Sequence, residues 1–305
     1  GDLLDGHSLE TACRGRNLVI HTAKLSTADA ERRTYYECNT KGTATVLHAC
    51  IASKVPRLVY TSDATVTYNG CKPTLEADES IRLPVAHVHP YASSIALAEK
   101  MIRDAHGWEM VVTDPASRRK GHAIDTTVVR LSTCALRPHL LWGKDIDGTI
   151  SRLRQHARRN RAVSIKGDVM STITHVANAA AAHLQIAERL TPESAVGGAA
   201  YFIGDEAPVP FWRWFITSLK EAGIEATPKS LSFQSAVRRS RIQRWLRRIG
   251  VPQRPVICAL DAYRTGISHT FCLNNAKKDF NYSTIMTPDA AVRERFMILD
   301  RTTAT

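Results

Sequence analysis

The chain has 305 residues, of which 44% are apolar and 23% are charged, and this balance excludes a wholly disordered protein. Its length allows one large core or two modest lobes. The net charge of +12 suits nucleic acid, an anionic membrane surface or an anionic cofactor such as a dinucleotide. Aromatic residues make up only 7% and do not alternate with the basic runs, which argues against nucleic acid as a partner.

The cysteines indicate a reducing compartment. There are seven, an odd number, and no two are arranged as C-x-x-C. This usage predicts neither a disulfide framework nor a zinc site, and we expect no metal. No apolar run approaches about 18 residues, so the sequence predicts no transmembrane helix and no signal peptide. A cytoplasmic protein is therefore expected.

The first elements along the chain are a short helix around residues 7–9 and a buried strand within residues 17–23. The strand ends in His21, Thr22 and Ala23, and Lys24 follows. The motif G-x-G-x-x-G, which brings backbone close to a pyrophosphate at a helix N-terminus, occurs nowhere in the sequence. Because the first residue is Gly rather than Met, a processed, truncated or partial chain is one expectation.

The next two segments predict a helix and then the centre of the protein. Residues 36–53 have apolar positions at 46, 47, 50 and 51, which is helical spacing. Residues 58–60 then form a short apolar run that ends in Thr61, Ser62 and Asp63. Further along, Tyr91 opens a segment rich in Ala, Ser and Leu. A buried strand that ends in hydroxyl groups, followed by a Tyr on a helix, is typical of an active site in an open α/β sheet.

Several motifs at these positions match one family. Residues 39–47 have the pattern N-x-x-G-T-x-x-V-L, residues 58–62 read L-V-Y-T-S, and residues 136–143 have the pattern L-R-P-x-x-x-x-G. Together with Tyr91 they resemble the extended short-chain dehydrogenase/reductase family. Residues 198–212, with the pattern G-x-A-Y-F-I-x-x-x-x-P-x-P-F-W, are similar to 3β-hydroxysteroid dehydrogenases and sterol-4α-carboxylate 3-dehydrogenases within it.

This resemblance implies an α/β fold with a Rossmann-type doubly wound parallel sheet. Residues 1–150 would form a partial NAD(P)-binding domain that lacks the first βαβ unit and carries an inserted loop at about residues 107–125. Residues 151–305 would form a smaller substrate lobe, interleaved with the last elements of the sheet.

The resemblance also implies the site residues. Tyr91 would be the acid or base of catalysis, and Ser62 or Asp63 would orient the alcohol. The family's Lys, which lowers the pKa of the Tyr, is replaced here by Ile95, and the family's Ser by Asp63. An Asp beside Tyr91 would raise the pKa of the Tyr and oppose base catalysis. The residues expected to bind NAD or NADP are Asp2, Thr22, Ala23, Lys24, Thr61, Pro138 and Leu140, although Asp2 also suits a helix cap or a turn.

The function implied is NAD(P)-dependent oxidation of the 3β-hydroxyl of a steroid or sterol. Because of residues 63 and 95, the alternative is a catalytically impaired family member that binds a sterol, a membrane or a partner protein. A sugar-nucleotide or flavonol-type reductase is a third hypothesis, and the segment at residues 198–212 disfavours it.

Two Arg-rich segments lie in the second half of the chain. Residues 151–161 hold five Arg and predict a solvated helix face. Residues 237–249 hold six Arg, with Ile242, Trp245, Leu246 and Ile249 on one side of a helix. This second helix could pack on the core beneath an arginine surface, or it could lie on an anionic membrane. The resemblance implies a homodimer as well, and the cytoplasmic face of the endoplasmic reticulum as a second location.

Overall fold

The computed structural model describes residues 1–26, 30–70, 72–113, 126–143, 148–251 and 256–287. Its centre is a four-stranded sheet in the order β1-β2-β6-β11, and all three neighbouring pairs are parallel. The central strands carry continuous buried runs, as expected for a parallel sheet that is covered on both faces. The strands are β1 Val19–His21, β2 Arg57–Thr61, β6 Ser132–Pro138 and β11 Ala200–Ile203.

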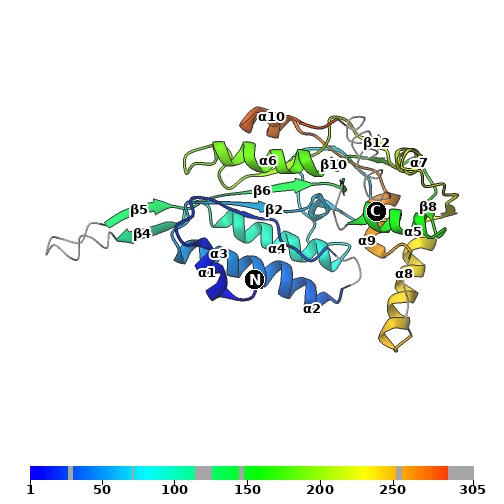
Figure 1. Cartoon of the computed structure of the whole chain (residues 1–305), viewed down its shortest axis with the longest axis horizontal. Helices are drawn as coiled ribbons and strands as arrows, with labels where there is room; N and C mark the ends of the chain where they lie inside the picture. The colour runs from blue at the N-terminus through cyan, green and yellow to red at the C-terminus, as the bar shows by residue number, and fades with distance from the viewer. Residues whose placement is uncertain (27–29, 71, 114–125, 144–147, 252–255, 288–305) are drawn as a thin grey trace, which may run out of the picture.

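Helices cover both faces of this sheet (Figure 1). Phe202 and Ile186 belong to the core between the sheet and α6 and α10, whereas Leu58, Val46 and Ile102 belong to the core on the side of α1, α3 and α4. The predicted doubly wound α/β fold is therefore confirmed. These helices are α1 Gly6–Cys13, α3 Gly42–Ala52, α4 Pro90–Asp104, α6 Val176–Arg189 and α10 Asn274–Phe280.

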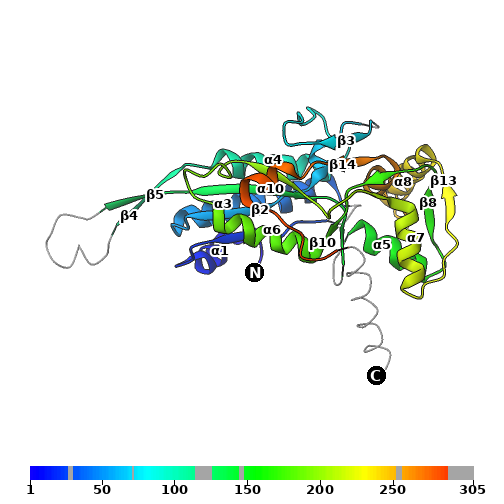
Figure 2. The same ribbon diagram turned by 90° about the horizontal axis from the view of Figure 1, so that it is seen from above.

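A smaller lobe lies at one end of the sheet, around α5, α7, α8 and α9 (Figures 1 and 2). Its core includes Trp142, Phe211, Trp212 and Phe215, so the last two aromatic residues of the segment at residues 198–212 pack inside it, whereas Tyr201 and Phe202 belong to the core of the main sheet. The second half of the chain also returns to the main sheet through β11, α6 and α10. The lobe's helices and strands are β7 Leu141–Trp142, α5 Thr149–Arg158, β8 Val163–Ile165, β9 Met170–Ser171, β10 Thr174–His175, β12 Val209–Pro210, α7 Phe211–Glu221, β13 Lys229–Leu231, α8 Phe233–Arg248, α9 Ala259–Gly266 and β14 His269–Phe271.

The predicted loop at residues 107–125 is wrong in its first part. β4 (Glu109–Thr113) and β5 (Thr126–Arg130) pair antiparallel as a ribbon that projects from the body (Figure 1). Both strands contain β-branched residues, including Val111 opposite Val128, and such residues favour a pleated ribbon. The rest of the predicted loop, residues 114–125, lies outside the described residues.

The predicted helix at residues 36–53 has two parts, a π-helix η1 (Tyr36–Lys41) and then α3. Gly42 at their junction has no Cβ, and a Cβ there would lie 3.0 Å from the Cβ of Leu3. This close contact explains the need for glycine at that position. The remaining short elements are α2 Arg32–Tyr35, η2 Ala64–Thr67 and β3 Thr74–Ala77.

Candidate active site

The carboxyl end of β2 brings together several of the predicted residues. Thr61 Oγ1 lies 2.6 Å from His183 Nε2 of α6, so this hydroxyl points away from α4. Ser62 is fully buried and its hydroxyl donates to Glu99 Oε2 of α4 at 2.6 Å. Consecutive strand residues point to opposite faces, which explains why the two hydroxyls meet different helices. Neither hydroxyl is directed at Tyr91.

Asp63 meets Tyr91 instead. The Tyr91 hydroxyl donates to Asp63 Oδ2 at 2.8 Å, and Arg264 Nη2 donates to the same oxygen at 2.7 Å. The other carboxylate oxygen accepts the backbone N–H of Thr65 at 2.9 Å. The guanidinium carbon of Arg264 lies 5.1 Å from the centre of the Tyr91 ring, within the range of a cation–π contact. Asp63, Tyr91 and Arg264 are all buried, and we call them the Tyr91 triad.

Sequence reasoning missed Arg264. It lies on α9, 201 positions after Asp63, and no motif marks it. Its Nη1 donates to Thr149 Oγ1 at 3.2 Å, and Thr149 in turn donates to Asp261. A buried carboxylate near the strand end requires a cation, so Asp63 alone could have signalled that a partner was needed.

The charges of the triad determine its protonation. Burial alone would raise the pKa of Asp63, but the positive charges of Arg264 and Lys24 outweigh burial and lower that pKa to about 2. Burial and the Asp63 carboxylate raise the pKa of Tyr91 well above its ordinary value. At neutral pH the triad therefore holds an ionised carboxylate and a protonated phenol.

Lys24 and Ile95 occupy the surroundings of the triad. Burial lowers the pKa of Lys24 to about 8, and its ammonium group donates to the carbonyl oxygen of Ser62 at 2.6 Å. Ile95 is completely buried in an apolar cluster with Tyr91 and Tyr35. Position 95 thus supplies packing where the family's Lys would supply a charge.

A second buried ion pair lies deeper along α4. Arg137 Nη2 donates to Glu99 Oε1 at 2.5 Å and Arg137 Nε donates to Glu99 Oε2 at 2.9 Å, a bidentate arrangement. Together with the Ser62 hydroxyl, this pair joins β2, α4 and β6. We call it the Glu99 pair. The Ser62 hydroxyl, which was predicted to orient a substrate, therefore donates its hydrogen bond to Glu99.

A histidine that the sequence did not single out lies near the triad. His139 Nδ1 lies 2.5 Å from the carbonyl oxygen of Thr172, so Nδ1 carries the proton and Nε2 accepts the hydroxyl of Tyr68 at 2.5 Å. Burial lowers the pKa of His139 to about 4. The ring is neutral at pH 7 and forms one wall of this buried polar region.

The residues predicted to bind a cofactor are found in two places. The exposed Thr22 and Ala23 follow β1, Thr61 ends β2, and Pro138 ends β6, so these four lie at the same edge of three neighbouring strands. Leu140 has a positive φ of 43° and its side chain packs in the core of the smaller lobe. Asp2 is exposed and accepts the backbone N–H of Leu4 at 3.0 Å, which is the turn role considered for it.

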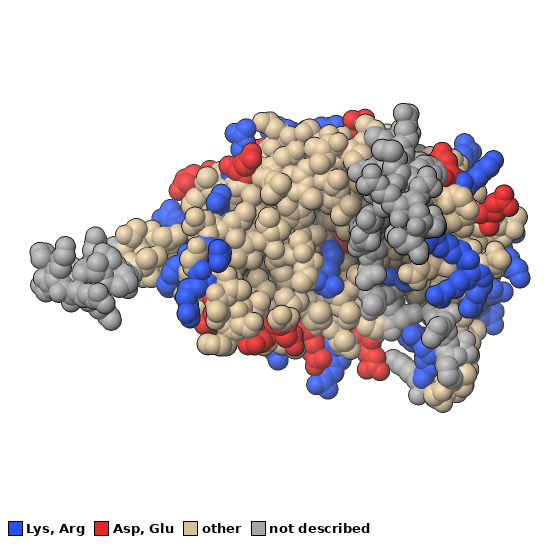
Figure 3. All heavy atoms as spheres, in the orientation of Figure 1, with Lys and Arg blue, Asp and Glu red and all other residues tan. Residues whose placement is uncertain are grey.

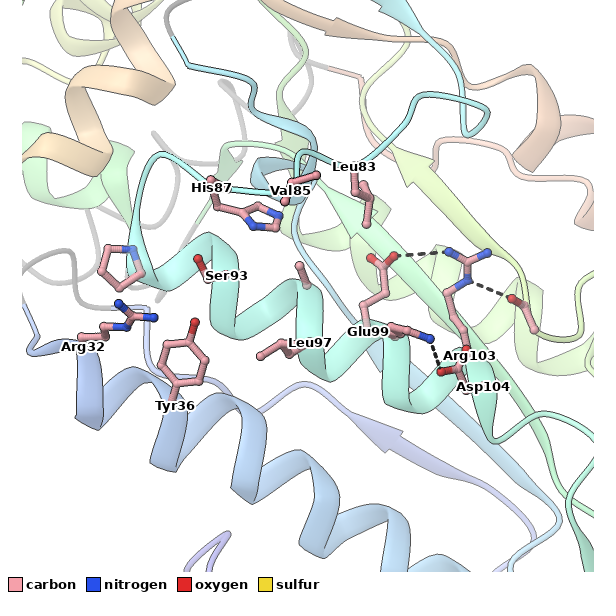
Figure 4. A pocket seen from close by; sticks show the side chains of 15 residues that line it. Arg32, Tyr36, Leu83, Val85, His87, Ser93, Leu97, Glu99, Arg103 and Asp104 are labelled. Atoms are coloured by element: carbon pink, nitrogen blue, oxygen red, sulfur yellow. Dashed lines mark hydrogen bonds and ion pairs between the residues drawn. The ribbon is translucent and has the colours of Figure 1, made fainter.

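Figure 4 shows a pocket of about 850 Å³ on the outer side of α4. Its lining includes Arg32 and Tyr36 from the neighbouring helix, and Val85 and His87 from the loop before α4. Neither Tyr91 nor Asp63 lines it. The pocket and the triad therefore lie on different sides of α4.

Residues 1–234 match the model of the 3-beta hydroxysteroid dehydrogenase/isomerase family. The chain belongs to this family. Its members are oxidoreductases that use NAD or NADP, so the predicted family and the general class of activity are confirmed.

Curated relatives have several activities. A 2-alkyl-3-oxoalkanoate reductase of Stenotrophomonas maltophilia is 30% identical, over 92% of this chain and 80% of that protein. The short-chain dehydrogenase/reductase family 42E member 1 of Danio rerio is 29% identical, over 92% of this chain and 72% of that protein. The sterol-4-alpha-carboxylate 3-dehydrogenase of Mus musculus is 25% identical, over 96% of this chain and 76% of that protein.

Solved structures with the same fold include RMD of Pseudomonas aeruginosa complexed with NADPH. Its TM-score is 0.64 at 16% identity, over 97% of this chain and 86% of that chain. An epimerase of Methanothermobacter thermautotrophicus has a TM-score of 0.70 at 14% identity, over 99% of this chain and 78% of that chain. At these identities the likeness shows a shared fold.

Proposed function

We propose that this chain is an NAD- or NADP-dependent oxidoreductase that interconverts the 3β-hydroxyl and the 3-ketone of a steroid or sterol. The observation that carries the proposal is the Tyr91 hydroxyl, buried at the carboxyl end of β2 and 2.8 Å from Asp63 Oδ2. Open α/β sheets bind their ligands at this edge. The sterol substrate is supported by the mouse relative, a sterol-4-alpha-carboxylate 3-dehydrogenase.

The protonation of Tyr91 favours one direction of the reaction. Since burial and the Asp63 carboxylate raise the pKa of Tyr91, its phenol keeps the proton at neutral pH. A protonated phenol can donate directly to a ketone oxygen, whereas oxidation of an alcohol requires a base. Asp63 is a weak base because its pKa is lowered to about 2. We therefore expect ketone reduction to be faster than alcohol oxidation.

Proton donation requires an exchange of partners. The ketone oxygen has to replace Asp63 Oδ2 as the acceptor of the Tyr91 hydroxyl. Asp63 would keep Arg264 and the Thr65 backbone N–H as partners, so no buried charge would be left unpaired. The positive charge of Arg264 lowers the pKa of Tyr91, so Arg264 would stabilise the phenolate that remains after donation. Ile95 cannot do this.

The described residues fit one end of a dinucleotide better than the other. Thr22, Ala23 and Thr61 lie at the carboxyl edge of β1 and β2, and their backbone groups would hold the nicotinamide end of the cofactor at this edge. The glycine-rich turn that holds a pyrophosphate does not occur in the sequence. When bound, NAD(P) would supply hydride to the ketone carbon or accept it from the alcohol.

A second candidate function is binding without turnover. It is favoured because one oxygen of Asp63 accepts hydrogen bonds from both the Tyr91 hydroxyl and Arg264. If a substrate cannot displace Asp63, Tyr91 never contacts a reacting oxygen. The chain would then bind a sterol or a partner protein on the same fold.

The test measures oxidation of NADPH and NADH by the purified chain with a 3-ketosteroid, together with cofactor binding by fluorescence. Tyr91→Phe is compared with Tyr36→Phe, a half-buried tyrosine outside the triad. Turnover that disappears in Tyr91→Phe and persists in Tyr36→Phe supports the proposal. Equal turnover in both variants would remove Tyr91 from the mechanism.

A wild-type chain that binds cofactor and steroid without turnover would favour the second candidate. In that case the double variant Asp63→Ser, Ile95→Lys restores a hydroxyl and a cation next to Tyr91. Turnover gained by this variant would identify residues 63 and 95 as the reason why the wild-type chain does not turn over substrate. Cofactor binding that is absent altogether would refute the oxidoreductase proposal for this chain.

A further inference from the structure

His89 is the residue directly before α4, and its ring is buried, with 3% exposure. Its Nδ1 atom accepts the backbone N–H of Tyr91 at 3.2 Å and thereby caps the helix. On the other side of the ring, Nε2 lies 3.4 Å from Nη2 of Arg244, a residue of α8. The ring of His89 therefore lies between α4 of the main body and α8 of the smaller lobe.

The two contacts of the His89 ring cannot both be hydrogen bonds. A backbone N–H and a guanidinium group only donate, whereas a neutral imidazole has a single acceptor nitrogen. Burial and the charge of Arg244 lower the pKa of His89 to about 3, so the ring is neutral at pH 7. Because Nδ1 accepts the N–H of Tyr91, Nε2 carries the proton. Nε2 and Arg244 Nη2 are then two donors 3.4 Å apart, and within the described ranges neither has a further hydrogen-bonding partner.

Arg244 has no carboxylate partner in the described part of the chain. Between Glu225 and Asp261 the sequence contains eight Lys or Arg and no Asp or Glu. Figure 3 shows Lys and Arg gathered at the end of the molecule that carries α5 and α8. Like every helix in the described ranges, α8 falls short of the length and apolarity needed to cross a membrane. The charge of Arg244 is therefore not compensated within these residues.

The other charged groups that act on His89 come from α9 and from α4 itself. Arg264 and Asp261 of α9 act on the ring with opposite signs. Arg264 is paired with Asp63. Asp261 is paired with Arg152. The N-terminal end of α4 adds the partial positive charge of its first backbone N–H groups. Taken together, these charges favour an anion beside His89.

We propose that His89 and Arg244 bind a phosphate group at the N-terminal end of α4. Because the two donors are 3.4 Å apart, one phosphate oxygen can lie about 2.9 Å from both. Arginine side chains and helix N-termini are the groups that proteins commonly use to bind phosphate. Arg244 is partly exposed, so the ligand can enter from its side. The ligand is free inorganic phosphate or the phosphate of a small organic molecule.

A bound phosphate would connect the two lobes. It would contact α4 through His89 and α8 through Arg244. It would also keep the proton on Nε2, the state in which Nδ1 accepts the backbone N–H of Tyr91. Phosphate should therefore stabilise the start of α4 and the position of Tyr91. An effect on turnover rests on the proposed function, whereas the binding of phosphate does not.

The test is isothermal titration calorimetry of the full chain with inorganic phosphate, at pH 7 and constant ionic strength. The wild-type chain should bind phosphate at a single site. Arg244→Gln should bind about 10- to 100-fold more weakly, because it removes a charge-assisted hydrogen bond. His89→Asn should bind about 10-fold more weakly, because the asparagine oxygen can still cap α4 but the donor at Nε2 is lost.

A second titration with phenyl phosphate identifies the source of the phosphate group. Binding that is tighter than that of inorganic phosphate, and that Arg244→Gln weakens, supports the site with an organic phosphate as its ligand. Equal or weaker binding of phenyl phosphate supports the site with the free ion as its ligand.

The matched control removes a charge from the same helix. Arg241 is exposed and lies three positions before Arg244, so Arg241→Gln changes the net charge equally. This variant should bind phosphate as the wild type does. Equal losses in Arg241→Gln and Arg244→Gln would reduce the effect to net charge and overturn the proposal. Circular dichroism and thermal unfolding of each variant identify losses that come from misfolding.

Two further results would also overturn it. The first is a folded wild-type chain that binds no phosphate. The second comes from nitrogen NMR of the His89 ring in the absence of phosphate. A proton on Nδ1 would leave Nε2 free to accept from Arg244, and the two donors would then have no need of a ligand. Because none of these measurements uses turnover or NAD(P), failure of phosphate binding is distinguishable from failure of the proposed function.

Discussion

The Glu99 pair and the Tyr91 triad both join α4 to the sheet, but they differ in purpose. The Glu99 pair is bidentate, its two side chains are 1% and 2% exposed, and it also accepts the hydroxyl of Ser62. The triad has one direct contact between its charges, its ionised side chains are 12% and 7% exposed, and one of its oxygens also accepts a phenol. Neighbouring residues directly after β2, Ser62 and Asp63, thus serve two different sites.

The difference shows where exchange of partners is feasible. Opening the Glu99 pair would leave Arg137 buried without its counterion and Glu99 with the partly exposed Arg103 at 3.7 Å, which costs several kcal/mol. Releasing Tyr91 from Asp63 breaks one hydrogen bond and leaves the ion pair with Arg264 in place, a cost of about 1 to 3 kcal/mol. The first site therefore stabilises the fold, and the second can respond to a ligand.

The largest effect is expected at the Glu99 pair. Glu99→Gln should lower the free energy of unfolding by about 3 to 5 kcal/mol, because Arg137 would remain buried and charged without its counterion. Urea denaturation at neutral pH measures this. The control is Glu109→Gln, whose pair with Arg130 is more than half exposed and should contribute no more than about 1 kcal/mol. Similar losses in both variants would contradict a structural role for the buried pair.

Asp63→Asn should cost less, about 2 to 3 kcal/mol at neutral pH. The lowered pKa, about 2 against 3.8, corresponds to a preference for the ionised form of this size. The asparagine oxygen can still accept the Tyr91 hydroxyl, and Arg264 keeps Thr149 as a partner. The variant then tests the charge of the triad alone.

The effect of Asp63→Asn on the free energy of unfolding should depend on pH in a direction that can be measured. Because the folded pKa of Asp63 is depressed, its stabilisation is complete above about pH 4 and is lost as the pH falls toward 2. In Asp63→Asn the free energy of unfolding should therefore fall less between pH 4 and pH 2 than it does in the wild type. In Asp168→Asn, which replaces an exposed carboxylate, it should fall as much as in the wild type. An unchanged acid limb in Asp63→Asn would contradict the ion pair with Arg264.

The smallest effect is expected at His139, beside the triad. Its ring stays neutral in the folded chain down to about pH 4, whereas in the unfolded chain it takes up a proton near pH 6.5. Stability is therefore lost as the pH falls from 6.5 toward 4, by about 2 kcal/mol at pH 5. His139→Asn should reduce the difference in unfolding free energy between pH 7 and pH 5 by that amount. Replacing the exposed His7 by Asn should leave the difference in unfolding free energy between pH 7 and pH 5 as in the wild type. If His7→Asn reduced that difference as much as His139→Asn, burial would not be the cause.

Much of the fold could be predicted from local patterns. The strand at residues 58–60 and the helix after Tyr91 followed from apolar runs and spacing, and both occur where expected. The aromatic segment near Phe211 and Trp212 packs as a core. The strand Glu109–Thr113 was missed because the run is short and lies between Gly107 and Pro115. A short run between such residues fits a loop as well as a strand.

The candidate site was predictable only in part. Tyr91 and Asp63 were identified from their positions, and their contact is observed at 2.8 Å. The engagement of Ser62 with Glu99 was not foreseen, because the direction of a side chain at the end of a strand depends on which helix covers that face. Peripheral membrane contact through residues 237–249 stays a prediction from the sequence.

The sequence by itself determined the strand at residues 58–60 and the helix after Tyr91, the resemblance to a dehydrogenase family and the two substitutions at residues 63 and 95. Each of these depends on residues close together in the chain or on a motif at a known distance. Only the tertiary structure decided which positively charged side chain pairs with Asp63. Arg264 lies 201 positions away, and a buried carboxylate pairs with whatever cation the packing of distant helices brings within hydrogen-bonding distance.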